Sequence, residues 1–455
     1  TTRLVGSEMC IRDSFYADAR RRKGLVNQMR KMKKGCSVLM CGTMVAGLMV
    51  GSVNAKETVT WWSWSTEATT ALNAQAEYAE ANADLDVELE LTSSADYWVK
   101  LPVAIAAGTG PDVYQMTRPD FESYAAAGNA MDLTEVIVNS PLLQEYLDSL
   151  DPVLVETYQF EGKQMGIPLT IECSAIVYNK TIMEAAGIDL EAIEDTWTWA
   201  DLQEIAEQLT VKDEKGETTQ YGFYVPADRL PSWEIIWTSG YDIFDETGEN
   251  CLLDDPGIAE ALQPLADMYQ SGVSPSIDVT TISSGDDMFM SGKIAMIAAG
   301  VWKVPTYSRI TGFEWDSVEL PVNPETGERY CSSNVCGLII NPKTENLDAA
   351  VALMEQLVQP ESQKLYADSN SAIPALEEVR EGYFDTEVAD RIEAFEDALD
   401  YVHPNVLSQY IPYQQFSQLY ADGLKQGITG EKTMAEALQD LDASITAVVE
   451  ENKAG

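Results

Sequence analysis

The sequence predicts an α/β protein of two lobes, each built around its own sheet. Strand-like and helix-like segments alternate from Glu57 to Met116, and the same alternation resumes after Ile167. The run from Gly166 to Lys180 lies between them: its Gly-Ile-Pro entry stops any helix, and a β-rich strand follows. The chain of 455 residues is also longer than one core usually fills. A chain that crosses between two lobes explains all three observations.

The first lobe is predicted from a strand–helix–strand–helix–strand order. Residues 57–64 (ETVTWWSW) form a strand, the Ala-rich 66–82 a helix, 86–91 an alternating second strand, 93–108 a Ser-capped helix and 110–116 a third strand. This order favours a parallel sheet with ligand-binding loops at the carboxyl ends of its strands. Pro111 and Asp112 are interpreted as structural residues of the turn before the third strand.

The second lobe repeats this pattern. We expect strands at residues 173–179 and 221–227, and helices at 200–209 and 257–271. Tyr178-Asn179 marks the start of the helix that follows the first of these strands.

The chain then has to return to the first lobe. Residues 289–305 contain a helix end, a Gly turn, a buried strand and Trp302, and we expect the return crossing there. A returning strand at 332–342 and a helix at 346–369 follow, and helices fill the rest to Lys453.

The first 55 residues are excluded from the predicted fold. From Met29, a basic segment, an apolar segment and the small-residue site at Val53-Asn54-Ala55 indicate a cleaved signal peptide and a mature start at Lys56. A membrane span remains an alternative, and a lipid anchor on Cys41 is disfavoured by Met40. Residues 1–28, with EMCIRDS at 8–14, are interpreted as a non-native leader produced by a sequencing adapter.

Composition and charge exclude several functions. Hydrophobic residues make up 45% of the chain, so it is globular. The first 55 residues carry ten of the 29 basic and three of the 74 acidic residues, which leaves a formal charge near −52 for the remainder. Such a charge repels nucleic acids and anionic membranes. It fits either a solvated coat for saline conditions or an ordinary acidic bias for solubility.

No catalytic, cofactor or metal motif is found in the sequence. The single histidine, His403, precedes a proline in an ordinary helix-ending context, so nucleophile–histidine schemes have little support. A glycosidase needs only two carboxylates, which the abundance of acidic residues leaves open. A Cys331–Cys336 disulfide is plausible in an oxidising compartment, although the sequence does not fix the pairing.

Four motifs in order carry a family resemblance: GTGPDVY at 108–114, the stretch 166–180, GKIAM at 292–296 and AIPA at 372–375. The chain resembles, over residues 56–453, the family 1 extracellular solute-binding proteins, the maltodextrin-binding-like receptors of ABC importers.

The resemblance implies a type II periplasmic-binding-protein fold with hinge crossings, the third of them near Pro374. Lobe 1 would span 56–168 and 301–373, and lobe 2 would span 169–300 and 374–455. It further implies a periplasmic monomer, without cofactor, that binds a sugar and docks on a membrane ABC permease.

A sugar receptor needs aromatic faces for pyranose rings and fixed polar groups for hydroxyls. Strand alternation puts Trp62 and Trp64 on one side of the first strand, so one of them should face the cleft, with core packing as the alternative. By resemblance, Trp302 is a ligand-stacking aromatic and Glu172 a carboxylate that binds sugar hydroxyls. Hinge packing is the alternative for Trp302 and a hinge salt bridge the alternative for Glu172.

Weaker candidates lie at strand ends and helix starts of both lobes. They are Tyr97, Trp98, Gln115, Met116, Arg118, Asp120, Trp233, Trp237, Tyr241, Asn334, Tyr410, Tyr413 and Phe416. Maltodextrin receptors of this family carry an aromatic residue and then an acid-base pair here, whereas this chain has Met116, Pro119 and Asp120. This departure argues against maltose specifically. Arg118 leaves an acidic sugar open as the ligand.

Two other functions stay open. One is a receptor for a polyamine or another organic cation. The acidic net charge would attract such a ligand, and the tryptophans of the chain could form an aromatic cage, which suits ammonium groups. A secreted glycoside hydrolase is the more distant alternative.

Overall fold

A computed structural model describes residues 56–454, apart from 65–67, 384–387 and 404–406. The expected non-native leader (1–28) and signal peptide (29–55) lie outside the described residues. From Lys56 onward the chain forms one compact unit, which contains two sheets and a short hairpin of β4 (Gln159–Phe160) and β5 (Lys163–Gln164).

The first sheet has six strands in the order β13-β6-β12-β3-β1-β2. The strands are β1 (Glu57–Trp64), β2 (Leu85–Thr92), β3 (Val113–Thr117), β6 (Ile167–Glu172), β12 (Asn334–Ile340) and β13 (Ile373–Pro374). The predicted strands β1, β2 and β3 are parallel, whereas β12 and β13 add antiparallel pairs. The helices that belong with this sheet are α2 (Thr69–Asn82), α3 (Ser94–Ala107), α4 (Arg118–Ala126), α5 (Thr134–Asn139), α6 (Pro141–Ser149), α7 (Pro152–Glu156), α15 (Leu347–Leu357), α16 (Pro360–Ala367) and α17 (Glu377–Tyr383).

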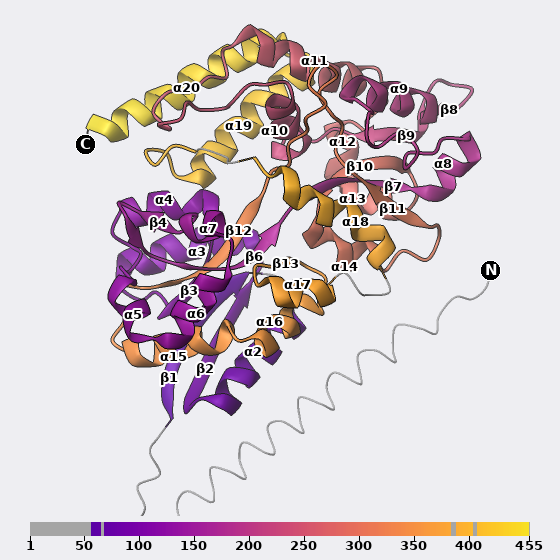
Figure 1. The fold of residues 1–455 in the computed structure, drawn as a ribbon. Helices are drawn as coiled ribbons and strands as arrows, with labels where there is room; N and C mark the ends of the chain where they lie inside the picture. The colour runs from indigo at the N-terminus through magenta and orange to yellow at the C-terminus, as the bar shows by residue number, and fades with distance from the viewer. Residues whose placement is uncertain (1–55, 65–67, 384–387, 404–406, 455) are drawn as a thin grey trace, which may run out of the picture. The chain divides into compact units, whose positions relative to one another are not determined.

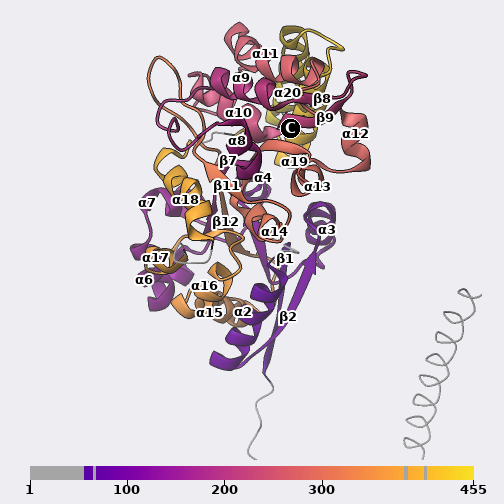
Figure 2. The ribbon, with the colours of Figure 1, turned by 90° about the vertical axis from the view of Figure 1, so that its right-hand side faces the viewer.

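The second sheet has five strands in the order β11-β7-β10-β9-β8. The strands are β7 (Ser174–Asn179), β8 (Val211–Lys212), β9 (Thr218–Tyr224), β10 (Ile294–Gly300) and β11 (Trp315–Val318). The helices around it are α8 (Lys180–Ala186), α9 (Trp199–Leu209), α10 (Arg229–Thr238), α11 (Pro256–Gln270), α12 (Ile277–Ile282), α13 (Gly285–Met290), α14 (Val304–Tyr307), α18 (Ala389–Asp397), α19 (Tyr413–Ile428) and α20 (Met434–Ala454), with short 3₁₀ turns at Val301–Lys303 and Ala398–Tyr401. Figures 1 and 2 show the two sheets at opposite ends of the described unit.

Local sequence explains where several of these elements begin. The Ser93 side chain caps α3 by accepting a hydrogen bond from the Asp96 N–H. Thr198 and Asp201 form a reciprocal capping box at the start of α9. Asn179 caps α8, as expected from the sequence. Asp112 fixes the turn before β3, because its carboxylate accepts hydrogen bonds from the Thr60 N–H and hydroxyl, both at 2.8 Å.

The first crossing between the sheets is a single residue. β6 ends at Glu172 in the first sheet and β7 begins at Ser174 in the second, so Cys173 alone joins them. The Val301 N–H donates to the Cys173 carbonyl at 2.9 Å and fixes this point to the end of β10.

The return crossing lies later than the sequence predicted. After Trp302 the chain stays with the second sheet, because α14 packs Tyr307 against Trp315 and Phe289, and β11 pairs with β7. The second crossing is therefore the segment 319–333 between β11 and β12, and the expectation of a crossing at Trp302 is wrong.

The third crossing also lies later than expected. Ile373–Pro374 still pairs with β6, and α17 packs on β13, whereas α18 packs on β11 of the second sheet. The passage therefore lies between α17 and α18, downstream of the expected position near Pro374.

Candidate ligand-binding site

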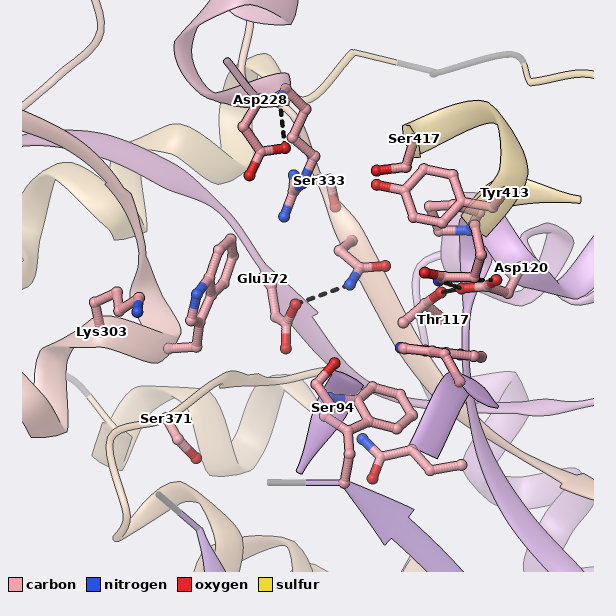
Figure 3. Close-up of a pocket in the computed structure, with 18 of the residues that line it drawn as sticks. Ser94, Thr117, Asp120, Glu172, Asp228, Lys303, Ser333, Ser371, Tyr413 and Ser417 are labelled. Atoms are coloured by element: carbon pink, nitrogen blue, oxygen red, sulfur yellow. Dashed lines mark hydrogen bonds between the residues drawn. The ribbon is translucent and has the colours of Figure 1, made fainter. Parts of the chain in front are cut away.

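A cavity of about 490 Å³ lies where the ends of the first sheet meet the elements of the second sheet. Figure 3 shows side chains from both parts converging on it, with Glu172 between Lys303 and Tyr413 in that view. It is lined by Trp64, Ser93, Ser94, Trp98, Gln115, Thr117, Pro119, Asp120, Glu172, Asp228, Arg229, Trp233, Trp302, Lys303, Ser333, Asn334, Tyr366, Ser371, Tyr413, Gln414 and Ser417.

An aromatic block forms one wall at the carboxyl end of β1. The Trp64 ring lies 5.2 Å from the Trp98 ring and 5.1 Å from the Tyr97 ring, centroid to centroid. Trp64 is the last residue of β1 and Trp98 lies in the first turns of α3, so the strand end and the helix start present both indoles together. Such paired rings offer a flat apolar surface to a ligand.

Asp120 is a buried carboxylate on the same side. It is 2% exposed and accepts hydrogen bonds from Thr117 Oγ1 at 2.7 Å and from Gln414 Nε2 at 3.2 Å. Thr117 ends β3, whereas Gln414 lies on α19, which packs with the helices of the second sheet, so this contact joins the two sides of the cavity. Burial raises the pKa of Asp120 to about 7, and the two hydrogen bonds oppose part of that rise.

Glu172 and Asn334 stand together beside the crossings. Asn334 is the register partner of Glu172 across β12 and β6, and its Nδ2 donates to Glu172 Oε2 at 2.9 Å (Figure 3). The Cys336 thiol donates to the other carboxylate oxygen at 3.6 Å. Burial raises the pKa of Glu172, while the Asn334 bond, the Arg229 charge and the Cys336 bond oppose the rise. The Asn334 Oδ1 atom is buried without a partner among the described residues, so it can accept from a ligand hydroxyl.

Trp302 and Arg229 form the facing wall. Trp302 follows β10 directly, and a Cβ on Gly300 would collide with its ring, so Gly300 is the residue that lets the indole fold back. The Arg229 guanidinium lies 5.2 Å from the centre of that ring, and its Nη1 donates to Ser332 Oγ at 3.1 Å. Lys303 is ion-paired with Asp286 at 2.7 Å. No ion pair of Arg229 occurs within the described part of the chain, although the charges of Asp228, Glu234 and Glu172 act on it.

A buried carboxylate ties this wall to the crossings. Glu234 of α10 is fully buried, and its Oε1 accepts from Ser174 Oγ at 2.9 Å and from the Ser332 N–H at 3.3 Å. Ser174 follows the first crossing and Ser332 lies in the second. Burial raises the pKa of Glu234. Glu234 therefore holds the two crossings beside each other, one residue away from the Ser333 that lines the cavity.

The structure brings most of the predicted residues together at this cavity. Those that line it are Trp64, Glu172 and Trp302, together with the weaker candidates Trp98, Gln115, Asp120, Trp233, Asn334 and Tyr413. Whether each contacts a ligand remains a prediction.

Four predicted residues that belong to the first sheet and its helices do not line the cavity. Trp62 lies under Lys100, whose Nζ is 4.0 Å from the ring centre, because it lies two residues before the end of β1. Tyr97 packs behind Trp64 and donates from its hydroxyl to the Gln115 carbonyl. Met116 is fully buried in the core. Arg118 pairs with Glu122 on α4 at 2.7 Å and is not among the residues that line the cavity.

Three further residues that line the cavity, Arg229, Asp228 and Gln414, were not predicted from the sequence. Asp228 and Arg229 begin α10 just after β9, so the strand-end argument used for the first sheet would have found them. Gln414 had no such signal, because α19 is placed at the cavity by packing against helices far away in sequence, among them α4 and α10.

The remaining candidates lie elsewhere. Trp237 is stacked on His403, with ring centres 4.3 Å apart, and burial lowers the pKa of His403 to about 4. Phe416 packs against Trp233 and Phe244. His403 is not among the residues that line the cavity. Among the described residues, no cluster of potential metal ligands is found.

The sequence profile of a family described as "Bacterial extracellular solute-binding protein" matches residues 73–396. The chain belongs to this family of bacterial extracellular solute-binding proteins. Membership confirms the expected resemblance, and it confirms the expectation of a receptor rather than an enzyme.

Curated relatives of this solute-binding protein include two sugar-binding proteins. The arabinooligosaccharide-binding protein of Halalkalibacterium halodurans is 33% identical over 183 residues, which is 37% of this chain and 39% of the relative. The maltotriose-binding protein of Pyrococcus abyssi is 26% identical over 283 residues, 61% of this chain and 58% of the relative. The matches thus span less than two thirds of either relative.

Solved structures confirm the predicted fold of the solute-binding protein. An ABC substrate-binding protein from Listeria monocytogenes, in complex with cycloalternan, matches at a TM-score of 0.77 and 24% identity, over 86% of this chain and 98% of that one. The Thermus thermophilus maltotriose-binding protein with bound maltotriose matches at a TM-score of 0.69 and 19% identity. This match covers 87% of this chain and 100% of that one. Because both identities are below 25%, these two structures show that the fold is shared and nothing further.

Among the described residues, no helix is both long and apolar enough to cross a membrane.

Proposed function

We propose that this solute-binding protein is an extracytoplasmic receptor that captures a sugar or oligosaccharide between two lobes and delivers it to an ABC permease. The observation that carries the proposal is the composition of the cavity: Trp64 and Trp98 on one wall, Trp302 on the other, and the Glu172–Asn334 pair between them. Indole faces suit the C–H faces of pyranose rings, and the polar pair suits hydroxyls.

The mechanism is closure around the ligand. One part of the cavity comes from the first sheet and the other from the second, and three crossings join them, so a ligand that contacts both parts stabilises the closed state. A micromolar complex requires about 8 kcal/mol, which a few stacked rings and several charge-assisted hydrogen bonds supply after ordering costs. Export by a cleaved signal peptide and transient docking on the permease complete the proposal.

An organic-cation receptor is the second candidate, because Asp120, Glu172 and Asp228 all line the cavity. Arg229 and Lys303 line the same cavity and oppose it, since a cationic ligand would be repelled by both. The sugar is therefore favoured.

The test is calorimetry of residues 56–455 with arabino-, malto- and galactooligosaccharides, glucuronate and spermidine. We expect one oligosaccharide class to bind, and Trp64→Ala to weaken it about 5- to 30-fold, corresponding to about 1–2 kcal/mol of lost stacking. Trp62→Ala is the matched control, because Trp62 is two residues away on the same strand and lies outside the cavity. Binding of spermidine alone, or equal effects of the two substitutions, would refute the sugar proposal.

A further inference from the structure

Two cysteines lie at the crossings between the sheets. Cys173 is the first crossing, and Cys331 belongs to the second; both are fully buried. The described chain has four cysteines, all free thiols in the structure. Cys336 contacts Glu172, and Cys251 lies near Asp442. The contacts around Cys173 and Cys331 place these two thiols beside each other.

Contacts of the Cys331 sulfur bring the two residues together. The Cys331 sulfur accepts a hydrogen bond from the Ser174 N–H at 3.1 Å and lies 3.4 Å from Ser174 Oγ. Ser174 is the next residue after Cys173. The Cys173 thiol is a neighbour of Cys331, and this neighbour, with burial, raises the pKa of Cys173. Among the described residues, no contact joins Cys331 to Cys336, the pair that the sequence suggested, and Cys336 on β12 contacts Glu172 instead.

We propose that Cys173 and Cys331 form a disulfide that links the first and second crossings. The proposal rests on export to an oxidising compartment, which is part of the proposed function. One thiolate attacks a small-molecule or protein disulfide and forms a mixed disulfide with release of one thiol. The second thiolate then attacks the mixed disulfide and expels the other thiol. The two cysteines lose two protons and two electrons, and the external disulfide is reduced to two thiols.

The bond is compatible with lobe closure because both residues are already fixed to the same region. The Val301 N–H donates to the Cys173 carbonyl at 2.9 Å, and the His403 N–H donates to the Cys331 carbonyl at 3.0 Å. Glu234 also binds both crossings through Ser174 and Ser332. A link at this position restrains the crossing segments while the distant ends of the two sheets remain able to rotate. The buried thiols react during folding, before the packing around them is complete.

The test is peptide mapping of the full chain exported to an oxidising compartment. The protein is denatured with iodoacetamide and without reductant, digested, and analysed by mass spectrometry. We expect a peptide pair joined through Cys173 and Cys331, which separates on reduction. Alkylation of both cysteines, or a link between Cys331 and Cys336, would overturn the proposal.

Variants make the result specific and independent of any ligand. Cys173→Ser should leave Cys331 open to alkylation, whereas Cys251→Ser should leave the linked pair intact, because Cys251 contacts Asp442 instead. Reduction of the wild type should lower Tm by several degrees, since the bond closes a long loop of the unfolded chain. A reduced and an oxidised sample with the same Tm would contradict the expected role in stability. The sugar proposal is untouched by either result.

Discussion

At the scale of single residues, the site depends on polar groups that are buried and only partly satisfied. Glu172 and Asn334 bond each other across β6 and β12, and Asn334 keeps a free Oδ1. A group that burial has already removed from water binds a ligand hydroxyl without a further desolvation cost. These two residues are therefore expected to contribute more to affinity than the exposed carboxylates of the surface.

We predict that Glu172→Gln weakens oligosaccharide binding about 5- to 100-fold. The substitution removes a charge-assisted acceptor from the cavity and places an amide against the Asn334 amide, which corresponds to about 1–3 kcal/mol. Calorimetry measures the effect. Glu90→Gln is the control, because Glu90 pairs with Lys100 outside the cavity. Equal affinity of wild type and Glu172→Gln would show that Glu172 serves only the hinge.

Asp120 should make stability depend on pH. Its pKa is raised from 3.8 to about 7, so the folded state holds the proton more tightly than the unfolded state. Its contribution to the free energy of unfolding is full below about pH 4 and is lost as the pH rises to about 7. The loss is at most about 4 kcal/mol, from the size of the shift.

Denaturant unfolding of wild type and Asp120→Asn at pH 4, 6 and 8 tests this point. We expect the advantage of the neutral Asn to grow with pH. Asp148→Asn, at an exposed position on α6, controls for the substitution itself. A constant difference between Asp120→Asn and wild type at all three pH values would contradict the assignment.

At the scale of elements, the sequence predicted what local patterns determine. The alternating strands β1 and β2 and the capped helices α3 and α9 lie where alternation and capping residues placed them. Trp302 was correctly placed after β10, but the crossing expected there was wrong. β11 is only four residues long and fully buried, so it has no period to detect, and it is defined by its long-range pairing with β7. The same limit hid Gln414, whose position depends on packing between helices far apart in sequence.

Gly222 is predicted to control the packing of α9 on β9. A Cβ at this position would collide with the Ala206 backbone, which cannot move as a side-chain end does. Gly222→Ala should therefore lower the free energy of unfolding by about 1–3 kcal/mol, measured by urea denaturation. Gly312→Ala is the control, because its Cβ would meet open space. Equal stability of the two variants would show that α9 and β9 separate at little cost.

At the scale of the whole described unit, we expect the crossings to convert ligand contact into a conformational signal. Arg229 on the cavity wall donates to Ser332, Ser332 donates to Glu234, and Glu234 accepts from Ser174 beyond the first crossing. These bonds form a continuous path from the cavity to the segments that join the sheets. Motion of one sheet relative to the other is thus expected to act through this path and through the Asp120–Gln414 contact.

Closure of the protein on a sugar is measurable by small-angle X-ray scattering of residues 56–455. The sample is measured alone and with the oligosaccharide that gives the strongest calorimetric signal. We predict that the radius of gyration falls on binding, and that Trp64→Ala needs a higher sugar concentration for the same fall. An unchanged radius of gyration at saturating sugar would contradict the account.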